Sequence, residues 1–223
     1  MEKSAKQATK RLRKGTGEAM SLEILQIKAG QADNFSYLIF SPTTSSGIAV
    51  DPSFGPEDLL AAAQERHVVI EILVDTHGHR DHVAGNELIL RETGAKLAAH
   101  PLDIPEADLP LKDGTRLSLG EDIVEILHTP GHTRGSITLN PPGALITGDT
   151  LFVTFVGRAD LSGSDPTALY HSLRRLAAFA PETVVYPGHD YGPRPTSTIG
   201  FERENNPYLQ CSDLESFLKL RMG

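Results

Sequence analysis

The sequence predicts a mixed α/β fold, on three observations. Short apolar runs separated by turn residues follow residue 21, which is typical of β-strands. Apolar residues then recur at helical spacing in segments that alternate with further short runs. Four of the runs end at, or close before, a histidine or an aspartate, so the ends of strands are expected to carry the chemistry. At 223 residues the chain suits one domain, which we assign to residues 21–223, after a flexible basic extension at residues 1–20.

The expected elements follow in chain order. Strands are expected at 22–29, 35–41 and 47–50, with turn residues between them. A helix should begin near Pro56, because proline suits the first turn and Glu57 and Asp58 lie at its positive end. The remaining elements are strands at 70–74, 96–99, 116–119, 123–127 and 184–186, helices at 85–91 and 166–179, and a terminal helix containing Cys211.

Bulk properties exclude several classes of protein. The formal net charge of −8 argues against nucleic acid as the main partner. No apolar run approaches the ~20 residues that a membrane-spanning helix needs. Cys211 is the single cysteine, so no intrachain disulfide can form and no oxidising compartment is required. Residues 1–20 are basic but lack the apolar segment of a secretory signal, so we expect a cytoplasmic protein, with organelle targeting by this tail as the alternative.

The densest chemical signal is the stretch Thr76-His77-Gly78-His79-Arg80-Asp81-His82, directly after the expected strand 70–74. It places four potential metal ligands within six residues. Imidazole and carboxylate at this density suit zinc, iron or manganese. A polar surface loop rich in histidine is the alternative interpretation, and it is disfavoured because further ligand candidates occur downstream.

Those candidates lie at three other strand ends. His132 follows the strand at 123–127, Asp149 follows the apolar run that ends at Gly148, and His189 follows the strand at 184–186. The total is five histidines and two aspartates. Two adjacent metals could therefore each receive three protein ligands and share one bridging carboxylate.

These seven residues, in this order, resemble the signature of the metallo-β-lactamase superfamily: two histidines, an aspartate and a histidine, then a lone histidine, a lone aspartate and a lone histidine. The resemblance covers about residues 51–189. It implies a four-layer αβ/βα sandwich with the metal site at one edge of the two sheets. Asp51, before Pro52, is then expected to orient a ligand by hydrogen bonding, although a turn-forming aspartate is an equal alternative.

Narrower similarities lie at 157–160, 169–173, 186–192 and 197–207, and they resemble the branch that contains persulfide dioxygenases and glyoxalase II, the hydroxyacylglutathione hydrolases. Only 34 residues follow His189, and their pattern is similar to the dioxygenase ending. The resemblance therefore favours oxidation of glutathione persulfide, or a similar thiol persulfide, to sulfite with O2 at mononuclear Fe(II). The alternative is a thioester hydrolase with a binuclear Zn, Fe or Mn site.

The two reactions imply different metal ligands. For the dioxygenase, the resemblance assigns Fe(II) to His77, His132 and Asp149. The other four residues then lie around these iron ligands and form hydrogen bonds that tune them: His79, Asp81, His82 and His189. For the hydrolase, His77, His79 and His132 hold one metal, Asp81, His82 and His189 hold the other, and Asp149 bridges them.

Catalytic roles are expected for Asp81, His132 and Asp149, and substrate contacts for Arg158 and Tyr191. A guanidinium can grip a glutathione carboxylate, whereas the alternative for Arg158 is a structural pair with Asp160 or Asp165. The substrate is expected to be a small thiol derivative, and a homodimer is left open. Three residues depart from the dioxygenase pattern: Ala159, Leu161 and Phe201. Four histidines are expected to be structural or to lie on the surface: His67, His100, His128 and His171.

Overall fold

The computed structural model describes residues 8–11, 22–30 and 32–223. In this part of the chain, one sheet has seven strands in the order β1-β2-β3-β4-β5-β6-β7. Neighbouring strands from β1 through β4 are antiparallel, and each of the pairs β4–β5, β5–β6 and β6–β7 is parallel. The strands are β1 (Ala8–Arg11), β2 (Glu23–Lys28), β3 (Phe35–Phe40), β4 (Ser46–Val50), β5 (Val69–Val74), β6 (Lys96–Ala99) and β7 (Leu109–Pro110).

The second sheet of the described residues has the order β15-β14-β11-β10-β9-β8, and β12 pairs with β13 alone. Within it, β11 and β14 are parallel, and the other pairs are antiparallel. The strands are β8 (Arg116–Leu119), β9 (Asp122–His128), β10 (Ile137–Asn140), β11 (Ala144–Gly148), β12 (Leu151–Phe152), β13 (Phe155–Val156), β14 (Val184–Pro187) and β15 (Ser197–Thr198).

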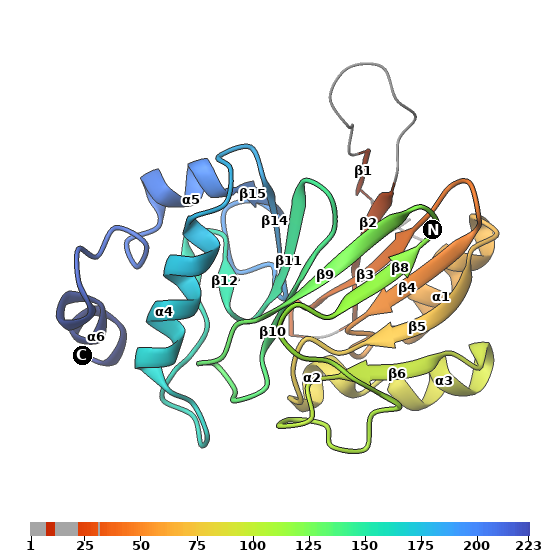
Figure 1. Cartoon of the computed structure of the whole chain (residues 1–223), viewed down its shortest axis with the longest axis horizontal. Helices are drawn as coiled ribbons and strands as arrows, with labels where there is room; N and C mark the ends of the chain where they lie inside the picture. The colour runs from red at the N-terminus through yellow and green to blue at the C-terminus, as the bar shows by residue number, and fades with distance from the viewer. Residues whose placement is uncertain (1–7, 12–21, 31) are drawn as a thin grey trace, which may run out of the picture.

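Helices cover the outer faces of the two sheets (Figure 1). Side chains of α1 and α3 pack against the outer face of the first sheet, and those of α4 and α6 against the second. A third cluster, with Tyr37, Val124 and Tyr186, fills the space between the sheets. The layers are therefore αβ/βα, as expected. The helices are α1 (Pro56–Glu65), α2 (Arg80–Val83), α3 (Asn86–Thr93), α4 (Pro166–Ala177), α5 (Ile199–Asn205) and α6 (Leu214–Met222).

Two expectations about the chain ends need correction. Residues 8–11 form strand β1 beside β2, although the sequence was interpreted as a flexible extension there. Main-chain hydrogen bonding can add such an edge strand without an apolar side-chain pattern. Residues 1–7 and 12–20 of that extension lie outside the described part. Cys211 precedes α6 rather than lying within it, because Asp213 caps the helix and starts it at Leu214.

The parallel pairs align the strand ends that carry the candidate ligands. In the first sheet, Val50 pairs with Val74, so Asp51 lies beside the start of the 76–82 segment. In the second sheet, Gly188 N–H donates to Gly148 O at 2.9 Å, which places Asp149 next to His189. The carboxyl ends of parallel strands meet at one edge of a sheet, and here the two edges face each other. No helix in the described residues is long and apolar enough to cross a bilayer.

Candidate metal centre

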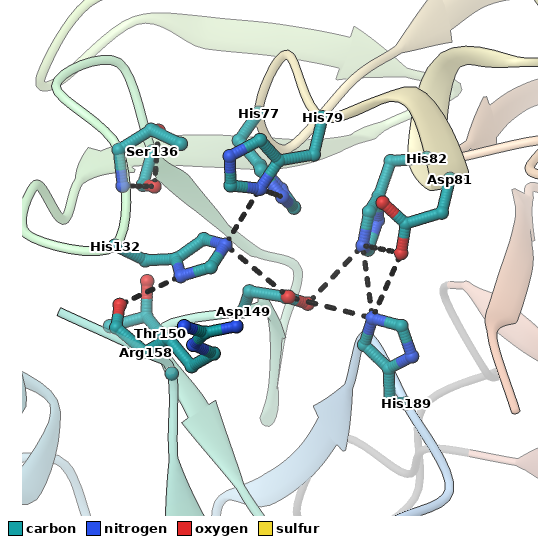
Figure 2. A network of polar contacts seen from close by, with 12 residues as sticks. His77, His79, Asp81, His82, His132, Ser136, Asp149, Thr150, Arg158 and His189 are labelled. Atoms are coloured by element: carbon teal, nitrogen blue, oxygen red, sulfur yellow. Dashed lines mark hydrogen bonds and ion pairs between the residues drawn. The ribbon is translucent and has the colours of Figure 1, made fainter. Parts of the chain in front are cut away.

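All seven predicted ligand residues meet at the edge of the two sheets (Figure 2). The loop after β5 and the start of α2 supply the four residues of the dense segment. The other three follow β9, β11 and β14. Figure 2 shows Asp149 between two groups, which we call the first trio and the second trio. The first trio is His77, His79 and His132; the second trio is Asp81, His82 and His189.

The first trio is built from three imidazoles that face one another. His79 Nδ1 lies 3.0 Å from His77 Nε2 and 2.9 Å from His132 Nε2. Nitrogens bound to one tetrahedral zinc at ~2.0–2.1 Å would lie roughly 3.3–3.4 Å apart, so the spacing is close to that of a ligand set. A proton between two ring nitrogens can satisfy only one of these two contacts, whereas a metal ion can bind all three nitrogens.

The second trio combines two imidazoles and a carboxylate. His82 Nε2 lies 3.2 Å from His189 Nε2 and 3.6 Å from Asp81 Oδ2. The His189 nitrogen is 3.4 Å from the same carboxylate oxygen. Asn34 Nδ2 also donates to this oxygen at 3.2 Å, which holds the Asp81 side chain in place.

Asp149 reaches both trios with its two carboxylate oxygens. Oδ1 lies 3.3 Å from His82 Nε2, and Oδ2 lies 3.4 Å from Nε2 of both His132 and His189. Oδ1 is buried, and although it lies within ion-pair distance of His82 Nε2, no group of the described residues donates it a hydrogen bond of normal geometry. A buried carboxylate oxygen without a donor is costly unless a cation satisfies it. The donor set therefore fits bound metal, and Asp149 fits a bridging ligand.

Hydrogen bonds to the other ring nitrogen fix the orientation of three histidines. Nδ1 of His82 donates to Asp51 Oδ2 at 2.9 Å. Nδ1 of His132 and of His189 donate to backbone oxygens, those of Arg158 and Ala32, each at 2.9 Å. In its neutral form, each ring consequently presents the Nε2 lone pair to the centre, as metal-binding histidines do.

Asp51 performs the orienting role that the resemblance implied. Its Oδ1 accepts from Thr76 N at 2.7 Å, and its Oδ2 accepts from Thr76 Oγ1 at 2.6 Å as well as from His82. The carboxylate is buried and joins the end of β4 to the loop after β5. The backbone at Asp51 is left-handed, with φ of 47°, so the turn-forming interpretation holds as well.

The charges at the centre compensate one another. Burial alone would raise the pKa of Asp149, but His82 and His189 lower it well below its usual range. Burial alone would lower the pKa of His82, yet Asp149 and Asp51 raise it well above the ordinary value. For His189, hydrogen bonds to Asp149 and Asp81 outweigh burial and raise the pKa to about 9. Burial lowers the pKa of His77 well below its ordinary value. Without a bound cation, protons on the second-trio histidines would balance the buried carboxylates.

Glycines give the ligands room. A Cβ on Gly188 would lie 2.4 Å from Asp149 Oδ1 and 3.0 Å from His82 Cε1. A Cβ on Gly157 would lie 1.8 Å from the carbonyl oxygen of Asp149. Any side chain at these positions would push Asp149 out of place.

The expected substrate residues lie at the rim. The Arg158 guanidinium makes a bidentate pair with Asp160, at 2.9 and 2.8 Å, which matches the structural alternative considered for it. Tyr191 stacks on His189, with ring centroids 4.5 Å apart and planes at 10°, and 56% of it is exposed. An exposed ring beside a ligand is accessible to substrate, whereas Arg158 must first leave Asp160.

The four histidines expected to lie outside the centre do so. His100 and His128 stack with centroids 4.2 Å apart, and His128 Nε2 donates to the backbone oxygen of Arg134 at 2.9 Å. Neither these residues nor His67 and His171 belong to a potential metal-binding group among the described residues.

Sequence reasoning missed Asp103, which joins the two loops that carry the first trio. Its carboxylate accepts from Gly78 N at 3.1 Å, from Thr133 Oγ1 at 2.6 Å and from Gly135 N at 2.8 Å. Gly78 lies between His77 and His79, and the other two donors lie in the loop directly after His132. No motif or strand end marks Asp103, so its role emerges only from the packing of the loops.

The family model described as the metallo-beta-lactamase superfamily matches residues 30–120 and 103–189. The chain belongs to this superfamily. A hydroxyacylglutathione hydrolase of Polaromonas sp. is 40% identical over 166 residues, which make up 71% of this chain and 62% of that protein. The chain thus spans about three fifths of the length of that relative.

Two solved structures are similar over most of the chain. ETHE1 from Myxococcus xanthus superposes with a TM-score of 0.84 at 30% identity, and the match covers 89% of both chains. TTHA1623 in a di-iron-bound form superposes with a TM-score of 0.72 at 33% identity, covering 82% of this chain and 99% of the other. The relatives therefore include a hydroxyacylglutathione hydrolase and a protein solved in a di-iron-bound form.

Proposed function

We propose that the protein is a two-metal hydrolase of glutathione thioesters. The observation that carries the proposal is the position of Asp149, whose two oxygens face both trios at 3.3–3.4 Å. In a mononuclear centre, the histidines outside the metal shell would orient the ligands from behind. His79 instead directs Nδ1 at the metal-facing nitrogens of His77 and His132, which is the position of a ligand.

The reaction consumes one water and yields a carboxylic acid and free glutathione. Bound metals would supply a water of lowered pKa and would polarise the thioester carbonyl. Zinc, iron and manganese all suit this mixture of imidazole and carboxylate ligands. The 40% identity to a hydroxyacylglutathione hydrolase supports the choice of substrate.

The protein side chains contribute charge and position. Asp149 remains ionised because its pKa lies well below the usual range, so its carboxylate is available to accept a hydrogen bond from an incoming water. His132 is held by the Arg158 carbonyl and contributes its Nε2. Tyr191, stacked on His189, forms an exposed aromatic wall on the second-trio side and fits the thiol half of the substrate.

Persulfide oxidation is the second candidate, favoured by the match to ETHE1 along 89% of both chains. In that reaction a thiol persulfide, O2 and water give the thiol and sulfite. His77, His132 and Asp149 would hold the iron. His77 shares one potential ligand group with His132 and another with Asp149, and His132 Nε2 lies 3.4 Å from Asp149 Oδ2.

One paired experiment separates the candidates. Metal content per chain is measured on anaerobically purified protein, and the same sample is assayed for thiol release from a hydroxyacylglutathione and for O2 uptake with glutathione persulfide. Two metals and thiol release without O2 uptake support the hydrolase. One iron with O2 uptake and no thiol release would overturn it in favour of the dioxygenase.

Matched variants show whether the activity belongs to this centre. Asp149→Ala and His132→Ala should lose the metal and the activity together. His171→Ala, a histidine outside the centre, should keep both. Full turnover by metal-free, folded Asp149→Ala protein would refute the site.

A further inference from the structure

A cavity of about 260 Å³ opens beside the first trio, on the side of His79. Three loops, including the segment after Asp160, border it around the 78–79 turn, and it is open to solvent. Its lining is Gly78, His79, Leu102, Asp103, Thr133, Arg134, Ser162 and Gly163. At ~30 Å³ per water, this volume corresponds to roughly nine waters, and it lies below the ~300–1,000 Å³ of pockets that hold whole drug-sized ligands. The cavity therefore suits one fragment of a glutathione conjugate.

The cavity and Tyr191 lie next to different trios. His79 belongs to the first trio, whereas Tyr191 stacks on His189 of the second trio, and Asp149 lies between the two (Figure 2). A thioester carbonyl placed near Asp149 would extend its thiol half toward Tyr191. Its acyl half would then extend toward His79 and into the cavity.

The chemistry of the lining identifies the kind of acyl group. Asp103 and Thr133 are already hydrogen-bonded to each other and to neighbouring groups. Arg134 is the single cationic side chain of the lining, it is exposed, and its guanidinium makes no ion pair or hydrogen bond in the described structure. Leu102, 53% exposed, adds an apolar surface. A short carbon chain that ends in an anion complements this combination.

The backbone beneath Arg134 is well held. His128 Nε2 donates to its carbonyl oxygen at 2.9 Å, and the ring of His128 stacks on His100. On the other side, Gly135 N–H donates to Asp103. A guanidinium on a fixed backbone loses less freedom when it binds a carboxylate.

We infer that this cavity receives the acyl group of the substrate and that Arg134 selects acyl groups ending in a carboxylate. The inference deepens the proposed hydrolase function and rests on it, because the bound fragment is an acyl group only if the protein hydrolyses thioesters. Arg134 is thus a specificity-determining residue for dicarboxylic acyl-glutathiones, and Leu102 packs along the carbon chain.

The test measures binding of two thioethers that cannot be hydrolysed, S-(3-carboxypropyl)glutathione and S-butylglutathione, to the metal-loaded protein by calorimetry. We expect the carboxylate ligand to bind about tenfold more tightly, as one charge-assisted contact predicts. Arg134→Gln should bring the two affinities together. Arg116→Gln, which removes a cation from β8 outside this cavity, should leave the preference intact.

Equal affinities in the unaltered protein, or a preference that survives in Arg134→Gln, would overturn the inference. Thioester hydrolysis is measured separately on succinyl-glutathione and butyryl-glutathione. If the binding preference depends on Arg134 but neither thioester is hydrolysed, the proposed reaction is wrong and the anion-binding cavity stands. If both thioesters are hydrolysed but binding shows no preference, only the role of Arg134 is wrong.

Discussion

Asp51 accepts a hydrogen bond from Nδ1 of His82 at 2.9 Å, and this contact decides which nitrogen of His82 faces the metal centre. Because the Nδ1 proton points at Asp51, the neutral His82 ring has its Nε2 lone pair toward Asp149 and His189. The carboxylate also accepts from the backbone and hydroxyl of Thr76, so one buried side chain sets both the ligand and the loop that carries it.

Asp51→Asn should therefore weaken binding at the second trio. An amide nitrogen in place of Oδ2 would donate to Nδ1, which would shift the His82 proton to Nε2 and block it as a ligand. Removing such a partner lowers metal affinity roughly 10–100-fold. A chelator-competition titration measures the affinity, with Asp113→Asn as a control because Asp113 pairs with Arg175 away from the centre. Equal affinity in Asp51→Asn and the unaltered protein would contradict the orienting role.

Metal loading should release protons at neutral pH. His189, with its pKa raised to about 9, and His82, raised well above its ordinary value, both carry a proton in the metal-free protein. Metal ligation requires neutral imidazole, so the affinity should rise with pH and level off above about 9. The binding enthalpy of the metal is measured by calorimetry at pH 7 in buffers of different ionisation enthalpy. Its dependence on the buffer gives the number of protons that the protein releases. Zero release would show that these histidines are already neutral.

The same pKa shift predicts how pH affects the stability of the metal-free protein. A histidine whose pKa is raised on folding stabilises the fold fully below its unfolded value of 6.5. That stabilisation is lost as the pH rises from 6.5 to about 9. The Tm of chelator-treated protein should thus fall over this range. A Tm that rises over this range would contradict the shift.

Gly188→Ala should remove the metal without unfolding the chain. The added methyl would meet Asp149 Oδ1 at 2.4 Å, so the Asp149 carboxylate must move. The Gly188 N–H to Gly148 O bond does not depend on the side chain. Gly114→Ala is the control: its φ of 75° costs about 1–2 kcal/mol of backbone strain, but no atom lies within 4 Å of the new methyl. Metal content and Tm of both variants distinguish loss of the centre from general destabilisation.

The sequence was sufficient to predict that the seven residues of the candidate metal centre meet, because they follow strand ends directly. His132, Asp149 and His189 each lie within a few residues of an apolar run. Parallel pairing of β11 with β14 brings Asp149 and His189 together, and β9, which is antiparallel to the intervening β10, ends at the same edge with His132. The four-layer arrangement came from the resemblance, since periodicity alone predicts only a mixed α/β fold. Short strands such as β12 and β13, two residues each, carry no periodic signal.

Other features depend on packing between distant segments. Glu202 is completely buried, where its Oε2 accepts from Thr154 N and Asn206 Nδ2, each at 2.9 Å. The tail that resembles the dioxygenase ending therefore holds the β12–β13 hairpin from behind. Phe201, which departs from that pattern, lies under the Arg194 guanidinium at 3.5 Å. A charged residue in a tail sequence gives no sign that it will be buried, because the hairpin that covers it lies nearly 50 positions earlier.

Asp103→Ala should weaken the first trio while sparing the second. Its carboxylate is the contact that joins the loop of Gly78 to the loop of Thr133 and Gly135. Without it, the N–H groups of Gly78 and Gly135 lose their acceptor and Thr133 Oγ1 keeps only Ser136. The separation between His79 and His132, now 2.9 Å from nitrogen to nitrogen, is then no longer fixed. A loss of roughly 10–100-fold in affinity is expected for the ion held by the first trio.

Asp51→Asn and Asp103→Ala should affect two different metal ions. Asp51 acts on His82 of the second trio, whereas Asp103 acts on loops of the first, so each variant should weaken a different ion. Stepwise titration with cobalt, followed by visible absorption, separates an ion bound to three imidazoles from one bound to two imidazoles and a carboxylate. Asp103→Asn keeps one acceptor oxygen and should recover part of the affinity. If both variants weakened the same ion, the assignment of the two trios to separate metals would be wrong.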